Sequence, residues 1–375
     1  MQMKRILPII LVVCMMLCAC SQAPAEQTTE PPVITTTENV TTQQTTETTA
    51  TTEATEETTV PETTEETVPV VLYRNPLNGM PMEEPYSARP FAVMINNIVY
   101  AQPMCSISNA DFLFEVLAEG GITRCLAVFS DVSGVEHIGS IRSARPYYVD
   151  LASSFNAIYA HHGGTDDGYN MIHKLDVDDI DAWDDNYFRD QARLDAGYAL
   201  EHTSFTHGQN LIEAANEYDY DLSYDSPVDY GFRFDEFGST ADGDAAESFD
   251  VVFGYYGKTT TLNYNGETGF YNAYQHNGDM IDGNTDEVVD FRNVLVIKAY
   301  TSTYEYGNTY VLDIELTGEG TGYFACDGKI VPIVWSRADQ YSPFVFAHED
   351  GTPITFGVGS TYAAIVPGGY DIVIK

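Results

Sequence analysis

Arginine and histidine side chains gather in one part of this chain, where their types and spacing suit the binding of an anion. Four of the ten arginines that follow residue 20 lie between Arg142 and Arg193, and six of the eight histidines lie between His137 and His207. Guanidinium groups bind phosphate and carboxylate through paired hydrogen bonds, and histidine transfers protons near neutral pH. In so acidic a chain this clustering indicates a site, although structural ion-pair networks give the same pattern.

Two of these arginines, Arg142 and Arg145, come just before a predicted helix. We expect Ser140 or Ser143 to cap this helix, with Pro146 in its first turn. The free backbone N–H groups of a helix start, flanked by two guanidinium groups, would bind a phosphate or a carboxylate. The alternative is that both arginines pair with carboxylates and serve only the fold.

A pair of histidines follows the next predicted strand. Residues 157–160 form a short apolar run typical of a buried strand, which ends at His161, His162 and two glycines before a helical pattern over 169–175. Ligands bind at such strand ends in α/β proteins. Because neighbouring residues of a strand point to opposite sides, we expect one of the two histidines at most to face a site. A histidine that is simply hydrogen-bonded within the fold is the alternative.

Five further residues are weaker candidates. Arg189 and Arg193 are four apart and would share one face of a helix, and His202 lies close by in the sequence. Glu115 and Glu119 lie near a predicted turn, where one of them could face the same site. Exposure to solvent is the alternative for both carboxylates.

The motifs of well-known catalytic and cofactor sites are missing from the sequence. It has no nucleophile elbow, P-loop, zinc motif or dinucleotide-binding fingerprint, so we expect no metal and no cofactor. Beyond the first twenty residues only Cys105, Cys125 and Cys326 remain, an odd number without the spacing of metal ligands. A disulfide between Cys105 and Cys125 is left open.

The chain begins with a secretory signal over residues 1–20. Lys4 and Arg5 precede an apolar run over 6–17 that is too short to span a membrane comfortably. The ending LCAC resembles the lipobox of bacterial lipoproteins, which implies cleavage before Cys20, lipidation of its thiol and tethering to the outer leaflet of the cell membrane. A signal that is cleaved elsewhere and releases the protein is the alternative.

Residues 21–70 form a predicted disordered stalk. This stretch consists largely of threonine, glutamate and proline, has no lysine or arginine and has few large apolar residues, so it cannot bury enough surface to fold. Its ten glutamates repel one another and its prolines stiffen it, which should extend the stalk away from the membrane. The density of threonine leaves O-glycosylation open.

The charge of the chain excludes some partners. The formal net charge is −39, and residues 71–375 alone carry 46 Asp and Glu against 15 Lys and Arg. So strong an excess of negative charge argues against binding to nucleic acid and against lying flat on anionic lipid.

The folded part, residues 71–375, is long enough for two domains. Apolar strands over 91–95, 111–117 and 122–129, a hairpin turn at 118–121 and a closing helix over 207–218 predict a mixed α/β domain over 71–235. Beyond a polar connection the pattern has period two, which predicts a mostly antiparallel β domain over 236–375. The expected strands of this second domain are 249–256, 259–264, 269–275, 288–300, 309–316, 322–326, 329–335, 344–347 and 361–366.

Several of these stretches occur together in one known family. The words RPFAVMINN, ADFLFEVLAEGGITR, IGSIRSARPYYVDLA, YAHHGG and YFRDQAR, in this order, resemble the YerB-like lipoproteins, a bacterial family of unknown function. The resemblance covers about residues 89–212 and, more loosely, the C-terminal part. It implies a mixed α/β domain followed by a β-rich one and supplies no activity. The chain departs from it at Glu201 and Thr203, where we expect proline and asparagine, so only His202 of that motif matches.

These observations lead to two hypotheses. The first is a lipid-anchored protein on the extracytoplasmic face of the membrane that binds an anionic envelope component or a protein partner. The second is a hydrolase or transferase acting on a phosphate- or carboxylate-bearing envelope polymer, with arginines holding the anion and a histidine as general base. The enzyme hypothesis is favoured if Arg142, Arg145, Arg189 and one of His161 and His162 converge on one pocket beside a carboxylate. It is disfavoured if they are spread over separate salt bridges.

Overall fold

A computed structural model describes residues 73–182, 186–254, 258–306 and 309–375, which all fall in one compact unit. The predicted signal peptide, the predicted lipidation site Cys20 and the predicted stalk lie outside the described residues. Within the described ranges, no helix is both long and apolar enough to cross a membrane.

The N-terminal region alternates strands with short helices, as its sequence pattern predicts. Its helices are α1 (Pro146–Ser154), α2 (Asp166–Leu175), α3 (Gln191–Asp195) and α4 (Gly208–Glu217), with 3-10 turns η1 (Val99–Ala101), η2 (Ile107–Asn109), η3 (Glu119–Gly121) and η4 (Leu200–His202). Its strands are β1 (Tyr73–Arg74), β2 (Pro81–Met82), β3 (Phe91–Asn96), β4 (Phe112–Leu117), β5 (Thr123–Phe129), β6 (Ile138–Gly139), β7 (Ile158–His161), β8 (Asp179–Asp181), β9 (Phe188–Arg189), β10 (Ser204–Thr206) and β11 (Arg233–Asp235).

The C-terminal region is built from strands. They are β12 (Asp244–Ala245), β13 (Ser248–Val252), β14 (Thr259–Asn265), β15 (Phe270–Gln275), β16 (Gly278–Asp279), β17 (Asp290–Phe291), β18 (Asn293–Ala299), β19 (Thr301–Tyr306), β20 (Thr309–Ile314), β21 (Gly318–Cys326), β22 (Lys329–Arg337), β23 (Val345–Ala347), β24 (Thr355–Gly357), β25 (Thr361–Pro367) and β26 (Ile372–Ile374). Most pairs are antiparallel, and the mixed α/β and β-rich classes predicted from the sequence are both confirmed.

One long mixed sheet runs through both regions. Its order is β12-β22-β21-β18-β25-β4-β5-β3-β7-β8, with β23 beside β22. The last long strand, β25, lies between β18 of its own region and β4 of the N-terminal region, and it is parallel to both. A second sheet, β16-β15-β14-β13-β26, and a small sheet, β6-β10-β9, complete the frame that carries the site.

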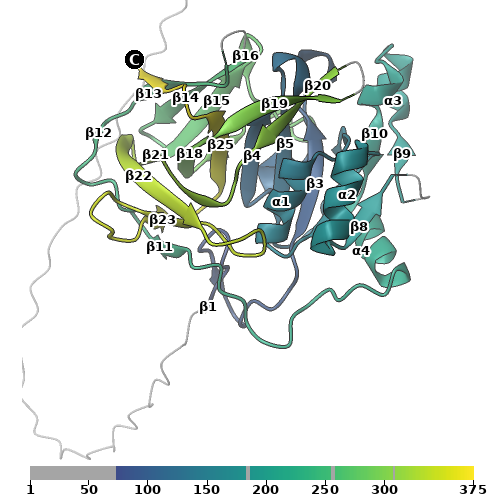
Figure 1. Cartoon of the computed structure of the whole chain (residues 1–375), viewed down its shortest axis with the longest axis horizontal. Helices are drawn as coiled ribbons and strands as arrows, with labels where there is room; N and C mark the ends of the chain where they lie inside the picture. The colour runs from purple at the N-terminus through teal and green to yellow at the C-terminus, as the bar shows by residue number, and fades with distance from the viewer. Residues whose placement is uncertain (1–72, 183–185, 255–257, 307–308) are drawn as a thin grey trace, which may run out of the picture. The chain divides into compact units, whose positions relative to one another are not determined.

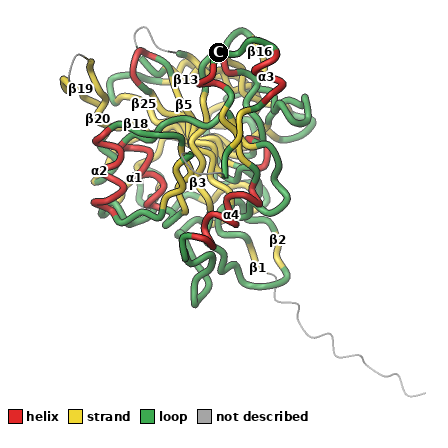
Figure 2. The backbone as a smooth tube through the Cα atoms, turned by 90° about the vertical axis from the view of Figure 1, so that its right-hand side faces the viewer, coloured by secondary structure: helices red, strands yellow, loops and turns green. Residues whose placement is uncertain are grey.

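Each face of the long sheet is covered by its own apolar layer. Successive residues of β18 point to opposite sides, so Leu295 and Ile297 join the core beneath α1 and α2, whereas Val294 and Val296 join the core beneath α4 and the second sheet. Figure 1 shows α1 and α2 in front of the sheet, and Figure 2 shows them on one side of β3 with α4 on the other. Three layers therefore enclose two cores.

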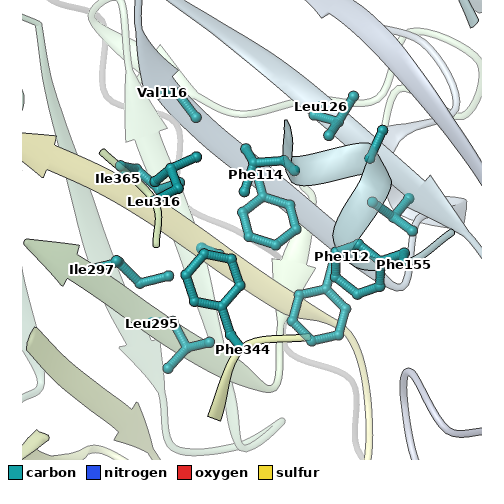
Figure 3. Close-up of a cluster of buried hydrophobic side chains, with 14 of the residues drawn as sticks. Phe112, Phe114, Val116, Leu126, Phe155, Leu295, Ile297, Leu316, Phe344 and Ile365 are labelled. Carbon is teal, nitrogen blue, oxygen red and sulfur yellow. The ribbon is translucent and has the colours of Figure 1, made fainter. Parts of the chain in front are cut away.

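The first core joins the two regions. Figure 3 shows Phe112 and Phe114 of β4 in one cluster with Leu295 and Ile297 of β18 and Ile365 of β25, with the ring of Phe344 between the two pairs. Residues far apart in the sequence are thus buried against one another, and the burial of their apolar surface favours folding of both regions together. The predicted boundary at residue 235 stays a prediction.

Two local predictions were wrong. The residue before α1 is Arg145, and the helix has no side-chain cap, so neither Ser140 nor Ser143 caps it. Arg189 and Arg193 do not share a helix face, because Arg189 ends β9 and α3 begins only at Gln191, where Asp190 accepts a hydrogen bond from the backbone N–H of Arg193.

Candidate functional site

A pocket of about 450 Å³ lies next to the carboxyl ends of β3 and β7, which run parallel. Its lining comes from the loop before α1, the residue after β7, strand β9 and turn η4. The lining residues are Ile141, Arg142, Ser143, His162, Arg189, Ala199, Leu200 and Glu201. Three sequence-predicted residues, Arg142, His162 and Arg189, are therefore brought together.

Backbone hydrogen bonds fix the floor of the pocket. The N–H of Arg142 donates to the carbonyl of Met94 in β3, and the carbonyl of Arg142 accepts from the N–H of His162. The neighbouring N–H of Ile141 donates to the carbonyl of Ser204 in β10. The loop before α1 is thus hydrogen-bonded to the long sheet and to the small sheet, which fixes the backbone that carries the Arg142 side chain.

The guanidinium of Arg142 has spare donor capacity. Its Nη1 donates to the carbonyl of Glu201 at 3.2 Å, while its Nε lies out of solvent and has no acceptor among the described residues. The nearest carboxylate oxygen, Oε2 of Glu201, is 3.6 Å from Nη1, and the Glu201 side chain is 59 % exposed. Because Nε is out of reach of solvent, the guanidinium, whose side chain is 22 % exposed, can meet a ligand oxygen only through its outer N–H groups.

Arg189 faces the same pocket from the edge strand β9. Its Nη1 donates to the carbonyl of Leu200 at 2.8 Å. No carboxylate of the described ranges lies within ion-pairing distance of its guanidinium. One turn, η4, thus holds both arginines through its carbonyls, and Arg142 also has the exposed Glu201 carboxylate within ion-pairing distance.

His162 lies between the two arginines and the small sheet. Its Nδ1 is 2.7 Å from Oγ of Ser204, and its Nε2 is 3.4 Å from Nη2 of Arg189. Because arginine only donates, Nε2 must accept, so the proton of a neutral ring is on Nδ1. Burial, and then the charge of Arg189, lower the pKa of His162 from its usual value. The neutral ring is therefore favoured.

The other predicted arginines serve the fold. Nε of Arg145 donates to Oε1 of Glu119 at 2.8 Å, and both side chains are largely buried. Burial raises the pKa of Glu119, but the hydrogen bond and charge of Arg145 outweigh it and leave that pKa lowered. Arg193 is buried, donates to the carbonyls of Ala101 and Pro103, and lies over the ring of Phe205.

The remaining predicted histidines are held inside the protein. His161 is fully buried, with Nδ1 2.9 Å from the carbonyl of Gly163 and Nε2 3.0 Å from Oδ2 of Asp179. His202 is buried too, with Nδ1 2.9 Å from the amide nitrogen of Asn96. As expected for neighbours in a chain, His162 alone of the pair faces the pocket.

Glu115 and the cysteines are also remote from the pocket. Glu115 is fully buried and pairs with Lys258 of the C-terminal region. Cys105, Cys125 and Cys326 are each buried without a disulfide, so the bridge left open between the first two is not formed. Across the described residues, no group of three or more His, Cys, Asp or Glu is placed to hold a metal ion.

Sequence reasoning missed Glu201 and the apolar wall. Glu201 lines the pocket, whereas the predicted His202 next to it is not among the lining residues, although its Nε2 is 3.6 Å from Oε1 of Glu201. Ile141, Ala199 and Leu200 add an apolar side, and Leu200 is exposed. The departure from the family motif at Glu201 was the one available signal. Together the residues can bind an anionic group with an apolar portion.

Comparison with known proteins agrees with this architecture. Residues 77–221 match the N-terminal domain model, and residues 249–363 the C-terminal domain model, of a protein family of unknown function, DUF3048. The chain belongs to this family. The pocket lies wholly within the part matched by the DUF3048 N-terminal model.

Two comparisons with Bacillus subtilis proteins extend the DUF3048 match. The curated "Putative lipoprotein YerB" of strain 168 is 28 % identical over 300 residues, which are 78 % of this chain and 86 % of the relative. A crystal structure of the YerB protein matches with a TM-score of 0.69 and 26 % identity, over 80 % of this chain and 99 % of that one. The resemblance inferred from the sequence is therefore confirmed, and the relatives give no activity.

Proposed function

We propose that this chain is a lipid-anchored bacterial protein of the extracytoplasmic membrane face that binds an anionic envelope component in the pocket between β7, β9 and η4. The lipobox-like ending at Cys20 and the lipoprotein name of the Bacillus subtilis relative support the anchor. The acidic stalk over 21–70 would hold the folded part away from the membrane.

One observation carries the binding proposal. Arg142 and Arg189 line one pocket, and among the described residues neither has a carboxylate at hydrogen-bonding distance, in a chain with a net charge of −39. Arginines that serve only the fold of an acidic protein would pair closely with its carboxylates, as Arg145 does with Glu119. Two guanidinium groups that share one pocket, neither of them closely paired with a described carboxylate, favour an anionic ligand.

The pocket supports binding more than catalysis. Of the residues named for the enzyme alternative, Arg145 lies elsewhere, and Nε2 of His162 accepts from Arg189, which competes with its use as a general base. Ser204, the hydroxyl beside His162, is buried and does not line the pocket. Ser143 does line the pocket, but the ring nitrogens of His162 lie against Ser204 and Arg189.

A ligand screen tests this function. The chain from residue 21 onward would be melted with sugar phosphates, teichoic-acid fragments and peptidoglycan stem peptides. A ligand at 100 times its Kd adds about 2.7 kcal/mol, which raises the melting temperature by roughly 5 °C. The double variant Arg142→Gln, Arg189→Gln should lose this rise, because both anion donors are gone.

The matched control is Arg233→Gln, which removes one exposed arginine far from the pocket lining. It should keep the full rise. If no anion stabilises the unaltered chain, or if the double variant keeps the rise, the pocket is not an anion site and a role in binding a protein partner gains.

A further inference from the structure

The charge of the pocket lining comes from a small set of groups. Among the described lining residues, Arg142 and Arg189 each bring one positive charge and Glu201 brings one negative charge, while burial and the charge of Arg189 lower the pKa of His162 and favour its neutral ring. These described residues therefore give the lining a net charge of one positive unit. A ligand with one negative charge neutralises this net charge, whereas a ligand with two negative charges leaves one excess negative charge in the pocket.

Glu201 is placed to act on a bound anion directly. Its Oε2 is 3.6 Å from Nη1 of Arg142 and its Oε1 is 3.6 Å from Nε2 of His202, so its carboxylate is near both groups without a hydrogen bond to either. The same residue offers its carbonyl to Arg142. An anion that reaches the Arg142 guanidinium must therefore approach the Glu201 carboxylate.

We propose that the pocket selects singly charged anions, a phosphodiester or a carboxylate, over doubly charged phosphomonoesters, and that Glu201 is the residue that sets this selection. The inference rests on the proposed function and names the chemical class of its ligand. It assigns a role to one of the two residues that depart from the family motif.

The physical reason is the different dependence of two energies on ligand charge. Attraction to the lining grows in proportion to the charge of the ligand, while the cost of removing the ligand from water grows with the square of that charge. With a net charge of only one positive unit, the lining offsets the desolvation of one negative charge far better than that of two. Without Glu201 the lining would carry two positive units, which suits a phosphomonoester.

The test measures affinity at pH 8 by calorimetry, using the chain from residue 21 onward. The probes are diethyl phosphate and lactate, each with one charge, and glycerol 3-phosphate, which carries two charges at this pH. In the unaltered chain at least one singly charged probe should bind about tenfold more tightly than glycerol 3-phosphate. The tighter of the two distinguishes a phosphodiester ligand from a carboxylate ligand.

The variant Glu201→Gln should bind every probe more tightly than the unaltered chain does, but the gain in affinity should differ between probes. Because the repulsion removed is proportional to ligand charge, the gain in affinity for glycerol 3-phosphate should be roughly the square of the gain for a singly charged probe. A fivefold gain for one would accompany about a 25-fold gain for the other. Glu213→Gln, which removes an exposed carboxylate of α4 outside the pocket, should change no affinity by more than about twofold.

The outcomes separate the two proposals. If none of the probes and none of the screened anions binds, the proposed function fails and this inference fails with it. If anions bind but glycerol 3-phosphate binds as tightly as the singly charged probes, the selection is overturned and the anion site stands. Equal gains for all probes in Glu201→Gln would likewise remove Glu201 as the selecting residue.

Discussion

Arg142 and Arg145 look equivalent in the sequence, yet their side chains do different things. Arg145 is bonded to Glu119 in a largely buried pair, whereas Arg142 reaches a pocket and touches only a carbonyl at hydrogen-bonding distance. At the scale of single residues, the two can therefore be separated by their effects on stability.

We predict that Arg145→Gln lowers the free energy of unfolding by about 2 kcal/mol, because it leaves the carboxylate of Glu119 largely buried without its charged partner. Arg142→Gln should cost less than about 1 kcal/mol, since its nearest carboxylate is exposed and 3.6 Å away. Urea titration of both variants measures the difference. Equal losses would contradict the division of roles and return Arg142 to the scaffold.

At the scale of elements, one buried ion pair ties β4 to the second sheet. Glu115 of β4 pairs with Lys258, which precedes β14, and its carboxylate also accepts from Thr123, Thr260 and Tyr362. Burial raises the pKa of Glu115, but the charge and hydrogen bond of Lys258 and the hydroxyls of Thr123 and Tyr362 outweigh it and leave that pKa lowered. The charged form of Glu115 is therefore favoured inside the protein.

We predict that Lys258→Met destabilises the protein by about 3–5 kcal/mol, because Glu115 keeps a buried charge without its partner. The double variant Glu115→Gln, Lys258→Met should recover part of this loss, since no charge is then stranded. Lys375→Met is the control: its pair with Asp250 is half exposed, so it should cost less than about 1 kcal/mol. Unfolding in urea gives all three values, and a small loss for Lys258→Met would show that the pair is dispensable.

At the scale of the whole molecule, the two family domains share strand pairings and a core. β25 supplies the neighbour of β4, and side chains from both regions meet in the core of Figure 3. A chain that stops at residue 235 would expose one edge of β4 and the apolar side chains that this core buries.

We predict that residues 21–235 alone show no cooperative unfolding transition, whereas residues 21–375 unfold in a single step. Circular dichroism in the near ultraviolet during a urea titration distinguishes the two cases. A sharp transition in the shorter chain, with fixed aromatic signals, would instead establish residues 71–235 as a domain that folds by itself.

Local patterns in the sequence predicted most of the longer elements. The apolar runs at 91–95, 111–117 and 122–129 became β3, β4 and β5, and the period-two runs of the C-terminal region became strands such as β14, β18 and β22. Such patterns succeed because side-chain direction within one element depends only on its own backbone period. The strand β19, which pairs with the following strand β20, and the missing serine cap of α1 were not predicted.

The site was predictable only as a set of candidates. The sequence by itself determined that cationic residues cluster between Arg142 and Arg193, that at most one histidine of the pair would face a site, and which family the chain resembles. Only the tertiary structure decided that Arg142, His162, Arg189 and Glu201 share one pocket while Arg145, His161, Arg193 and His202 are held by the fold. The physical reason is that these residues come from separate elements, and which of them finds a carboxylate, a carbonyl or open space depends on how the sheets and turns pack together.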